Sequence, residues 1–236
     1  VARAERTITA TVPEISAIRL EPANVKLARA AADVSSTIRG LPARIEPKVF
    51  AVYANGDEVE ITQSPELTLR TNGDAVVIDN GRLHSMDGNT GDDALVAVYR
   101  GKTVSAPLSV IGLQRLNVRS TAVGNSENDL VLNAIEKTGA YQRVRISGEL
   151  VFTDGERVTV PPADLSIRAV PFAASRSMAS AVQVDGDIVV GSRAGKADVL
   201  VEAYGHSGSI TLEVSDKPVD IDLVDIPVLK RGTFAA

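Results

Sequence analysis

The chain has 236 residues, of which 44% are hydrophobic and 23% are charged, a balance typical of soluble globular proteins. Its formal net charge of −5 gives no electrostatic attraction to nucleic acids or anionic membranes, so we expect neither as a partner. Cysteine is absent, which excludes disulfide bonds, a thiolate nucleophile and a cysteine-ligated metal.

The apolar residues are mainly Val, Ile, Leu and Ala, and aromatic residues make up only 3% of the chain. β-Branched residues favour strands, so the interior is expected to be built from them. No apolar run approaches the roughly 20 residues of a membrane-spanning helix, and no signal-peptide pattern opens the chain. The first residue is Val1 and not Met, as expected either of a processed mature chain or of an excised piece of a longer polypeptide.

Short runs of alternating apolar residues follow one another through the first half, which predicts strands rather than helices. Several of these runs are separated by dipeptides typical of turns: Asn55-Gly56, Asn80-Gly81 and Arg100-Gly101. They favour turns because Asn and Gly accept a positive φ at little cost. The predicted strands cover residues 7–12, 17–20, 48–53, 67–70, 75–78 and 94–99.

The second half repeats the pattern of the first with a period of roughly 100 residues, the size of an immunoglobulin-like domain. Four segments match in the same order: 15–20 with 113–118, 52–57 with 151–156, 77–83 with 183–188, and 95–99 with 200–204. The sequence therefore predicts an all-β chain of two tandem immunoglobulin-like antiparallel β-sandwich domains.

We place domain one at residues 14–112 and domain two at residues 113–216, with almost no linker between them. Residues 1–13 are expected to form an extra strand, at the end of a preceding repeat or at an edge of domain one. Residues 217–236 form a C-terminal extension outside the repeat.

Both halves resemble the bacterial immunoglobulin-like group 2 (BIG2) domain. In the first half the resemblance lies in the opening at 18–27, the turn at 53–57, the Asn80-Gly81-Arg82-Leu83 step and the closing strand at 94–99. The second half has no proline at the opening and carries an insertion around 124–139. The resemblance implies a β-sandwich used in tandem on invasin and intimin-type adhesins, surface-layer proteins and phage virion proteins.

The sequence offers few residues that could form a catalytic site. The only histidines, His84 and His206, lie beside repeat turns, where solvated strand-end positions are expected. The run from Gly205 to Ser209 shares part of the nucleophile-elbow pattern but lacks its final glycine and falls between two strands, which favours a hairpin loop. We expect no catalytic residues and no enzymatic activity.

The best candidate metal site is the loop at residues 87–93, where Asp87, Asn89 and Asp92 offer the oxygen ligands that Ca²⁺ prefers. Its spacing is not that of an EF-hand. An acidic solvated hairpin is the alternative, because Asp, Asn and Gly are also the residues of turns. The matching loop at 191–195 has no carboxylate, so the fold itself requires no metal there.

The sequence offers two other candidate binding surfaces. A sugar-binding face is disfavoured because the chain has four Tyr, four Phe and no Trp, and the repeat aligns Tyr53 with Phe152 and Tyr99 with Tyr204, as expected of packing residues.

In the C-terminal extension, Val219, Ile221 and Leu223 alternate with aspartates, which predicts a strand that pairs with a partner. The alternative is the first strand of a further repeat.

These expectations favour a non-catalytic structural, spacer or adhesive module of a bacterial cell-surface or fibre protein, located outside the cell. Its partners would be proteins of that assembly or neighbouring repeats of the same polypeptide. A structural or decorative component of a bacteriophage virion is the first alternative. An accessory module of a secreted polysaccharide-active enzyme is the second, and it would require a catalytic domain elsewhere in the polypeptide.

Overall fold

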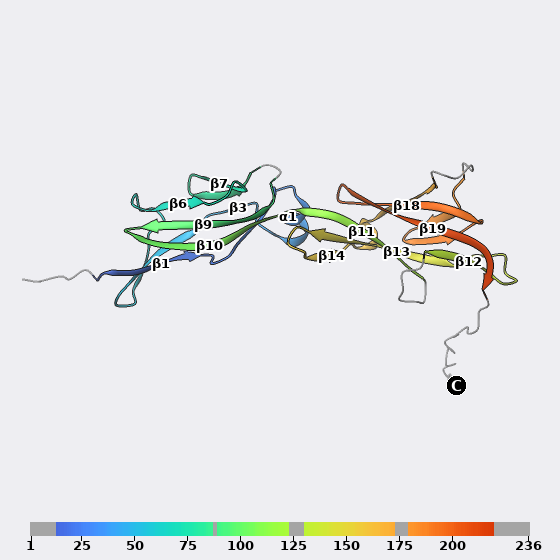
Figure 1. Cartoon of the computed structure of the whole chain (residues 1–236), viewed down its shortest axis with the longest axis horizontal. Coiled ribbons are helices and arrows are strands. Elements are labelled where there is room, and N and C mark those ends of the chain that lie inside the picture. The colour runs from blue at the N-terminus through green and yellow to red at the C-terminus, as the bar shows by residue number, and fades with distance from the viewer. Residues whose placement is uncertain (1–12, 87–88, 123–129, 173–178, 220–236) are drawn as a thin grey trace, which may run out of the picture. The chain divides into compact units, whose positions relative to one another are not determined.

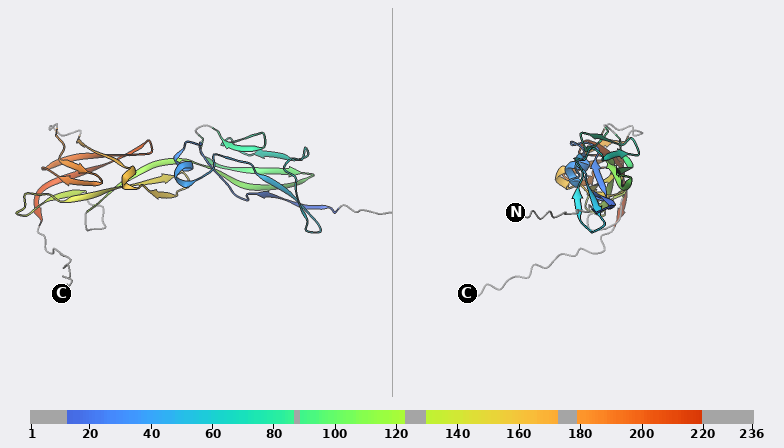
Figure 2. Two further views of the ribbon diagram at one scale, coloured as in Figure 1. Left: turned by 180° about the vertical axis from the view of Figure 1, so that it is seen from behind. Right: turned by 90° about the vertical axis from the view of Figure 1, so that its left-hand side faces the viewer.

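The computed structural model describes residues 13–86, 89–122, 130–172 and 179–219. Contacts divide the chain into two compact units. One comprises Val1–Gln114 with Phe152–Glu156, and the other comprises Arg115–Val151 with Arg157–Ala236. Each unit is built almost entirely of strands (Figure 1 and Figure 2).

The first unit contains ten strands and one short helix within its described residues. In chain order they are β1 (Ile15–Glu21), β2 (Val25–Ala28), α1 (Val34–Arg39), β3 (Arg44–Ile45), β4 (Lys48–Tyr53), β5 (Glu58–Glu60), β6 (Thr68–Thr71), β7 (Val76–Asp79), β8 (Arg82–Ser85), β9 (Gly91–Tyr99) and β10 (Lys102–Ile111).

The strands of the first unit form two layers with the order of an immunoglobulin-like sandwich. One layer contains β1-β4-β5 and β3-β8-β7, and β3 and β4 follow each other so closely that they serve as one strand. In immunoglobulin letters this layer is A-B-E-D. The other layer, β2-β10-β9-β6, is A′-G-F-C. Figure 1 shows β9 and β10 side by side in this second layer.

The second unit repeats this order. Its elements are β11 (Leu113–Ala122), β12 (Val131–Ile135), β13 (Arg143–Phe152), β14 (Arg157–Thr159), the 3₁₀ turn η1 (Pro162–Asp164), β15 (Ser166–Pro171), β16 (Val182–Asp185), β17 (Ile188–Gly191), β18 (Gly195–Ala203) and β19 (His206–Val219). The sheets β11-β13-β17-β16 and β12-β19-β18-β15 are again A-B-E-D and A′-G-F-C. The predicted pair of immunoglobulin-like sandwiches is therefore confirmed.

The pairing is not purely antiparallel. The A′ strand of each unit, β2 or β12, lies parallel to its last strand, β10 or β19. The reason lies in the chain path. After β1 the chain continues in the same direction but moves to the opposite sheet, and the last strand of that sheet runs in the same direction. The neighbouring pairs β9–β10 and β18–β19 are antiparallel hairpins, as expected.

The core of each unit comes from alternate residues of these strands, since successive side chains of a strand point to opposite faces. In β9 the buried inward residues are Leu95, Ala97 and Tyr99. Burial of one Leu, Ile or Val side chain contributes roughly 1.5–3 kcal/mol to stability. The fully buried aliphatic side chains include Leu27, Val49, Leu83 and Leu108 in the first unit, and Leu132, Ile146, Leu150 and Leu212 in the second.

Helix α1 was not predicted. It begins after Asp33, whose carboxylate accepts hydrogen bonds from Ser35 N at 2.9 Å and Ser35 Oγ at 2.6 Å, and it ends at Gly40 with φ of 67°. Six residues are too few to show an apolar stripe at helical spacing, so only these caps could have signalled it. In the part of the chain that the structure describes, no helix is long and apolar enough to cross a membrane.

Candidate functional site

The acidic loop is the strongest sequence candidate, and its described residues are engaged separately. Asn89 Nδ2 donates to the backbone oxygen of Asp74 at 3.3 Å, whereas Asp92 Oδ1 accepts a hydrogen bond from Ser109 Oγ at 2.7 Å. Asp87 lies outside the described residues. Among the described residues, no group of three or more His, Asp or Glu side chains could hold a metal ion. Calcium binding by Asp87, Asn89 and Asp92 therefore stays a prediction.

Asp93 binds the connection between β6 and β7, and the sequence analysis did not single it out. Its Oδ1 accepts hydrogen bonds from the backbone N–H groups of Asn72 at 3.0 Å, Gly73 at 2.7 Å and Ala94 at 2.6 Å. A Cβ at position 73 would lie 3.1 Å from this carboxylate, so glycine permits the close approach. The Asn72-Gly73 turn, which needs a partner for its N–H groups, was the available signal. Asp93 acts here as a structural cap.

The other oxygen of Asp93 is unusual. Asp93 Oδ2 is buried and makes no hydrogen bond, the one such side-chain atom within the described residues. A buried carboxylate oxygen without a partner costs free energy, which the three hydrogen bonds to Oδ1 offset. Asp93 lies in β9, and two of the N–H partners of its Oδ1, those of Asn72 and Gly73, lie in the connection between β6 and β7, so the effect of this carboxylate is local to the first unit.

The two histidines lie in different units and on strands. His84 sits within β8, opposite Arg44 of β3 and Val77 of β7, and is half-buried rather than solvated at a strand end. The expectation for His84 was wrong because β8 is a central strand. His206 is the first residue of β19 and pairs with Ala203 across a hairpin, which confirms the predicted hairpin at this run.

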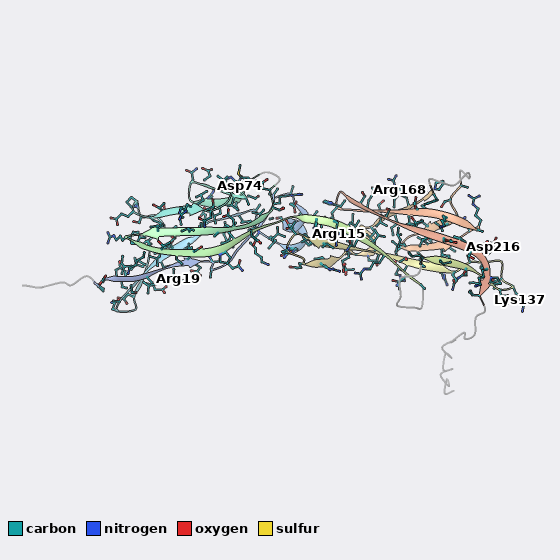
Figure 3. All side chains as sticks on the ribbon, viewed as in Figure 1. Arg19, Asp74, Arg115, Lys137, Arg168 and Asp216 are labelled. Atoms are coloured by element: carbon teal, nitrogen blue, oxygen red, sulfur yellow. The ribbon has the colours of Figure 1, made fainter. Side chains whose placement is uncertain are left out.

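An open cleft of about 430 Å³ lies beside that hairpin in the second unit. Its lining includes Asp164, Glu202, Tyr204 and His206. Tyr204 Oη donates a hydrogen bond to Asp164 Oδ2 at 2.6 Å, and Glu202 forms an ion pair with Arg168 at 3.0 Å. Figure 3 shows the labelled Arg168 on β15. Both carboxylates that line the cleft, Asp164 and Glu202, are therefore already paired.

The turns at the ends of β4 and β13 repeat in detail. Tyr53 N donates to Asp57 O at 2.9 Å, and Phe152 N donates to Glu156 O at 2.9 Å. Gly56 adopts φ of 88°, which explains why glycine follows asparagine there. The alignment of Tyr53 with Phe152 is therefore confirmed by the backbone.

The alignment of Tyr99 with Tyr204 is wrong by one residue. Tyr99 is the last residue of β9 and is buried, whereas Tyr204 lies in the turn after β18 with φ of 50°. The structural counterpart of Tyr204 is Arg100, with φ of 45°. The sequence match rests on identity of residue type, but each turn places its αL residue directly before glycine, and that position decides the correspondence.

The C-terminal candidates are only partly described. Val219 is the last residue of β19, lies opposite Ile135 of β12, and its backbone oxygen accepts from Glu136 N at 3.2 Å. Strand β19 therefore continues past Asp216, labelled in Figure 3, and the second sandwich extends beyond the expected boundary there. Ile221 and Leu223 lie outside the described residues. A partner-binding role for these three residues stays a prediction.

No family model matches this sequence, and no curated protein matches it. Among solved structures, domains 5-6 of the S-layer protein SbsC are 14% identical, with 87% of this chain and 99% of that chain covered and a TM-score of 0.32. The S-layer protein rSbsC(31-844) is 17% identical, with 90% of this chain but only 28% of that chain covered and a TM-score of 0.37.

A third similar structure is the C-terminal 282-residue fragment of intimin, in complex with the intimin-binding domain of the translocated intimin receptor. It is 13% identical, with 87% of this chain and 64% of that chain covered and a TM-score of 0.30. The immunoglobulin-like assignment rests on the strand order of each unit. The resemblance to group 2 domains stays a prediction from the sequence.

Proposed function

We propose that the chain is a non-catalytic structural or adhesive module of a bacterial cell-surface or fibre protein, and that both units are group 2 immunoglobulin-like domains. One observation carries the proposal: the A–G sandwich is repeated, and only Gly112 separates the last strand of the first sandwich, β10, from the first strand of the second, β11. Each sandwich closes its own core and passes the chain directly to the next, as a serial spacer requires.

The residues that carry the family resemblance support this proposal by their positions. Asn55-Gly56 forms the turn after β4, Asn80-Gly81 joins β7 to β8 with φ of 50° and 78°, and residues 94–99 lie in β9, the strand before the last strand of the sandwich. These segments set the turns and the register of the sandwich. They supply no reacting group, which agrees with a structural use of the domain.

The side-chain chemistry of the described residues also supports a structural role. Several exposed carboxylates and guanidinium groups pair with each other across strands, as Arg19 does with Glu58 at 2.7 Å and Arg119 does with Glu149 at 3.3 Å. Such exposed pairs contribute little to stability, about 0–1 kcal/mol each, but keep a β-rich surface soluble. Partners would then be proteins of the surface assembly or neighbouring repeats.

Localisation tests the proposal. Antibodies raised against the purified chain would be applied to intact source cells, to permeabilised cells and to purified phage particles. We expect labelling of intact cells at their exterior. Labelling confined to virions would support the virion alternative and overturn the cell-surface assignment. Labelling of cells seen only after permeabilisation would also overturn the cell-surface assignment. Pre-absorption of the antibody with the chain is the control.

A further inference from the structure

One outer face of the second unit gathers arginines from three strands. They are Arg115 and Arg119 of β11, Arg143 and Arg145 of β13, and Arg157 of β14. Strands β11 and β14 both pair with β13, and the intervening residues Leu116, Val144 and Ile146 are buried, so the five arginines share the solvent side of one sheet. Figure 3 labels Arg115 on β11. We call this surface the arginine face.

The arginines of this face are more exposed than the carboxylates that they contact. Glu149 Oε2 accepts hydrogen bonds from Arg119 and Arg157, both at 3.3 Å. The Glu149 side chain is only 20% exposed, whereas those of Arg119 and Arg157 are 50% and 52% exposed. A guanidinium has five N–H donors, so one shared carboxylate oxygen leaves most donors of both arginines available to a ligand.

The other three arginines are also only partly neutralised. Arg145 forms an ion pair with Asp187 at 3.0 Å, in which the arginine side chain is 61% exposed and the aspartate side chain 25%. Arg115 and Arg143 are exposed and form no ion pair with any described residue. Asp185 of β16 lies in the same cross-strand row as Arg145 and adds one more carboxylate. Among its described residues, the arginine face therefore holds more cations than carboxylates.

The corresponding sheet of the first unit does not carry this charge. Three positions that are arginine in the second unit are glutamate in the first: Arg119 corresponds to Glu21, Arg145 to Glu46 and Arg157 to Glu58. The last pair illustrates the correspondence, because Arg157 lies opposite Val151 of β13 and Glu58 lies opposite Val52 of β4. The sandwich accepts either charge at these positions, so its folding does not require arginine there.

The chemistry of the face favours a ligand rich in carboxylate groups. Arginine binds carboxylates through paired N–H donors, and this face already binds those of Glu149 and Asp187. The exposed large hydrophobic side chains of the described chain all lie elsewhere, so a peptide partner finds no apolar anchor here. Strands β11, β13 and β14 have one aromatic residue, Phe152, which is buried, so nucleobases have no stacking surface.

A polymer fits the face better than an extended anionic surface does. The whole chain has a net charge of −5, so the rest of the protein would be repelled by an anionic membrane. A single anionic polymer can contact the arginine face alone. Recognition through carboxylates also needs no aromatic platform of the kind that binds neutral sugars.

We propose that the arginine face binds an acidic polysaccharide, whose carboxylates are held by Arg115, Arg119, Arg143, Arg145 and Arg157. The inference rests on the proposed cell-surface role and deepens it, because it assigns attachment to an acidic polysaccharide at the cell exterior to one sheet of one unit. The guanidinium groups are exposed, so salt screens their attraction to the ligand.

Isothermal titration calorimetry of the full chain with sodium polygalacturonate, a linear polyuronate, tests the proposal. We expect saturable binding at low salt that is weakened at least tenfold in roughly 0.5 M salt, where charges are screened within a few ångströms. Dextran, a neutral polysaccharide, should not bind. Absence of polygalacturonate binding at low salt would overturn the proposal.

A triple variant locates the binding site. Arg119→Gln, Arg145→Gln and Arg157→Gln together remove three charges and three ion pairs from the arginine face. Binding should weaken by roughly tenfold or more, because charge-assisted hydrogen bonds to the ligand are lost. An unchanged affinity would overturn the proposal.

A second triple variant is the matched control. Lys137→Gln, Arg168→Gln and Lys196→Gln remove the same charge and also three ion pairs, but from other surfaces of the second unit. The affinity should stay unchanged. Equal weakening by both triple variants would show that net charge governs binding, and would overturn the assignment to the arginine face.

Arg143→Gln covers the case in which the first triple variant fails to fold. Arg143 has no ion pair with a described residue to lose, so stability should not change, whereas affinity should fall about two- to fivefold, as for one exposed ion pair. An unchanged affinity there would also overturn the proposal. Equally tight binding of poly-L-glutamate or single-stranded DNA would overturn the assignment to a polysaccharide. Failure of the cell-surface assignment would leave polygalacturonate binding as predicted, so the two proposals fail separately.

Discussion

Tyr204 donates its phenolic hydrogen bond to Asp164 in the second unit, and Arg100 makes the corresponding contact with Glu66 in the first. Both donors occupy the αL position of the turn between strands F and G, and both acids lie just before strand C. The residue types differ, yet the two donors and the two acids occupy the same positions in the fold. Each sandwich therefore has a side-chain tie, a hydrogen bond that joins the F–G turn to the loop before strand C.

This tie predicts a pH-dependent contribution to stability. The hydrogen bond to Asp164, with a smaller effect of desolvation, raises the pKa of Tyr204 above its ordinary value near 10. Because the folded pKa is raised, the contribution is complete below pH 10 and is lost as pH rises through the folded pKa. Tyr204→Phe should therefore destabilise the chain by less than about 1 kcal/mol at pH 7, since the tyrosine is partly exposed.

Spectrophotometric titration of the tyrosines provides the measurement. Hydrogen bonding to Asp216 also raises the pKa of Tyr141, so two high-pH steps are expected, and Tyr204→Phe should remove one of them. Tyr141→Phe is the matched control and should remove the other. A Tyr204→Phe variant that kept both steps would contradict the assigned hydrogen bond.

Asp93 should matter more to stability than its neighbour Asp92. Asp93→Asn weakens an acceptor of three backbone N–H groups and should lower the free energy of unfolding by about 1–2 kcal/mol. Asp92→Asn keeps an acceptor for Ser109 on the surface and should cost less than about 0.5 kcal/mol. Urea denaturation of both variants gives the comparison, and equal losses would show that Asp93 does not cap the turn.

The proposed calcium site is testable on the intact chain. If Asp87, Asn89 and Asp92 bind Ca²⁺, the melting temperature should be higher in millimolar Ca²⁺ than in chelator, because binding at ten times the Kd adds about 1.4 kcal/mol. The double variant Asp87→Asn and Asp92→Asn should remove the shift, while Mg²⁺ at the same concentration controls for ionic strength. Identical melting in calcium and chelator would end the proposal.

Two deletions separate the sandwich from the C-terminal extension. Removal of residues 217–236 takes away the part of β19 that pairs with Ala134 and Ile135, so the second unit should lose about 1–2 kcal/mol. Removal of residues 220–236 leaves that pairing and should not change stability. If Ile221 and Leu223 bind a partner, the shorter deletion should still abolish co-assembly with surface extracts, and retained assembly would exclude that role.

Local chemistry predicted the parts of the fold that depend on neighbouring residues. The alternation in residues 48–53 located β4, and Asn80-Gly81 located the β7–β8 hairpin, because side-chain period and positive φ are local properties. The parallel A′–G pairing was not predicted, since it depends on which sheet the chain joins after β1. Asp93 was missed as a cap because its three N–H partners include residues about 20 positions away.

The parallel pairing of the A′ and G strands in both units is tested most directly by amide hydrogen exchange on the full chain, followed by NMR. The side chains of Glu213 and Arg29 are at the surface or close to it, yet their N–H groups bond to Leu130 O and Ile111 O. We expect both amides to exchange at least about 100-fold more slowly than unbonded surface amides, at rates close to those of the core strands. Rapid exchange at both positions would contradict the A′–G pairing, and with it the repeated sandwich.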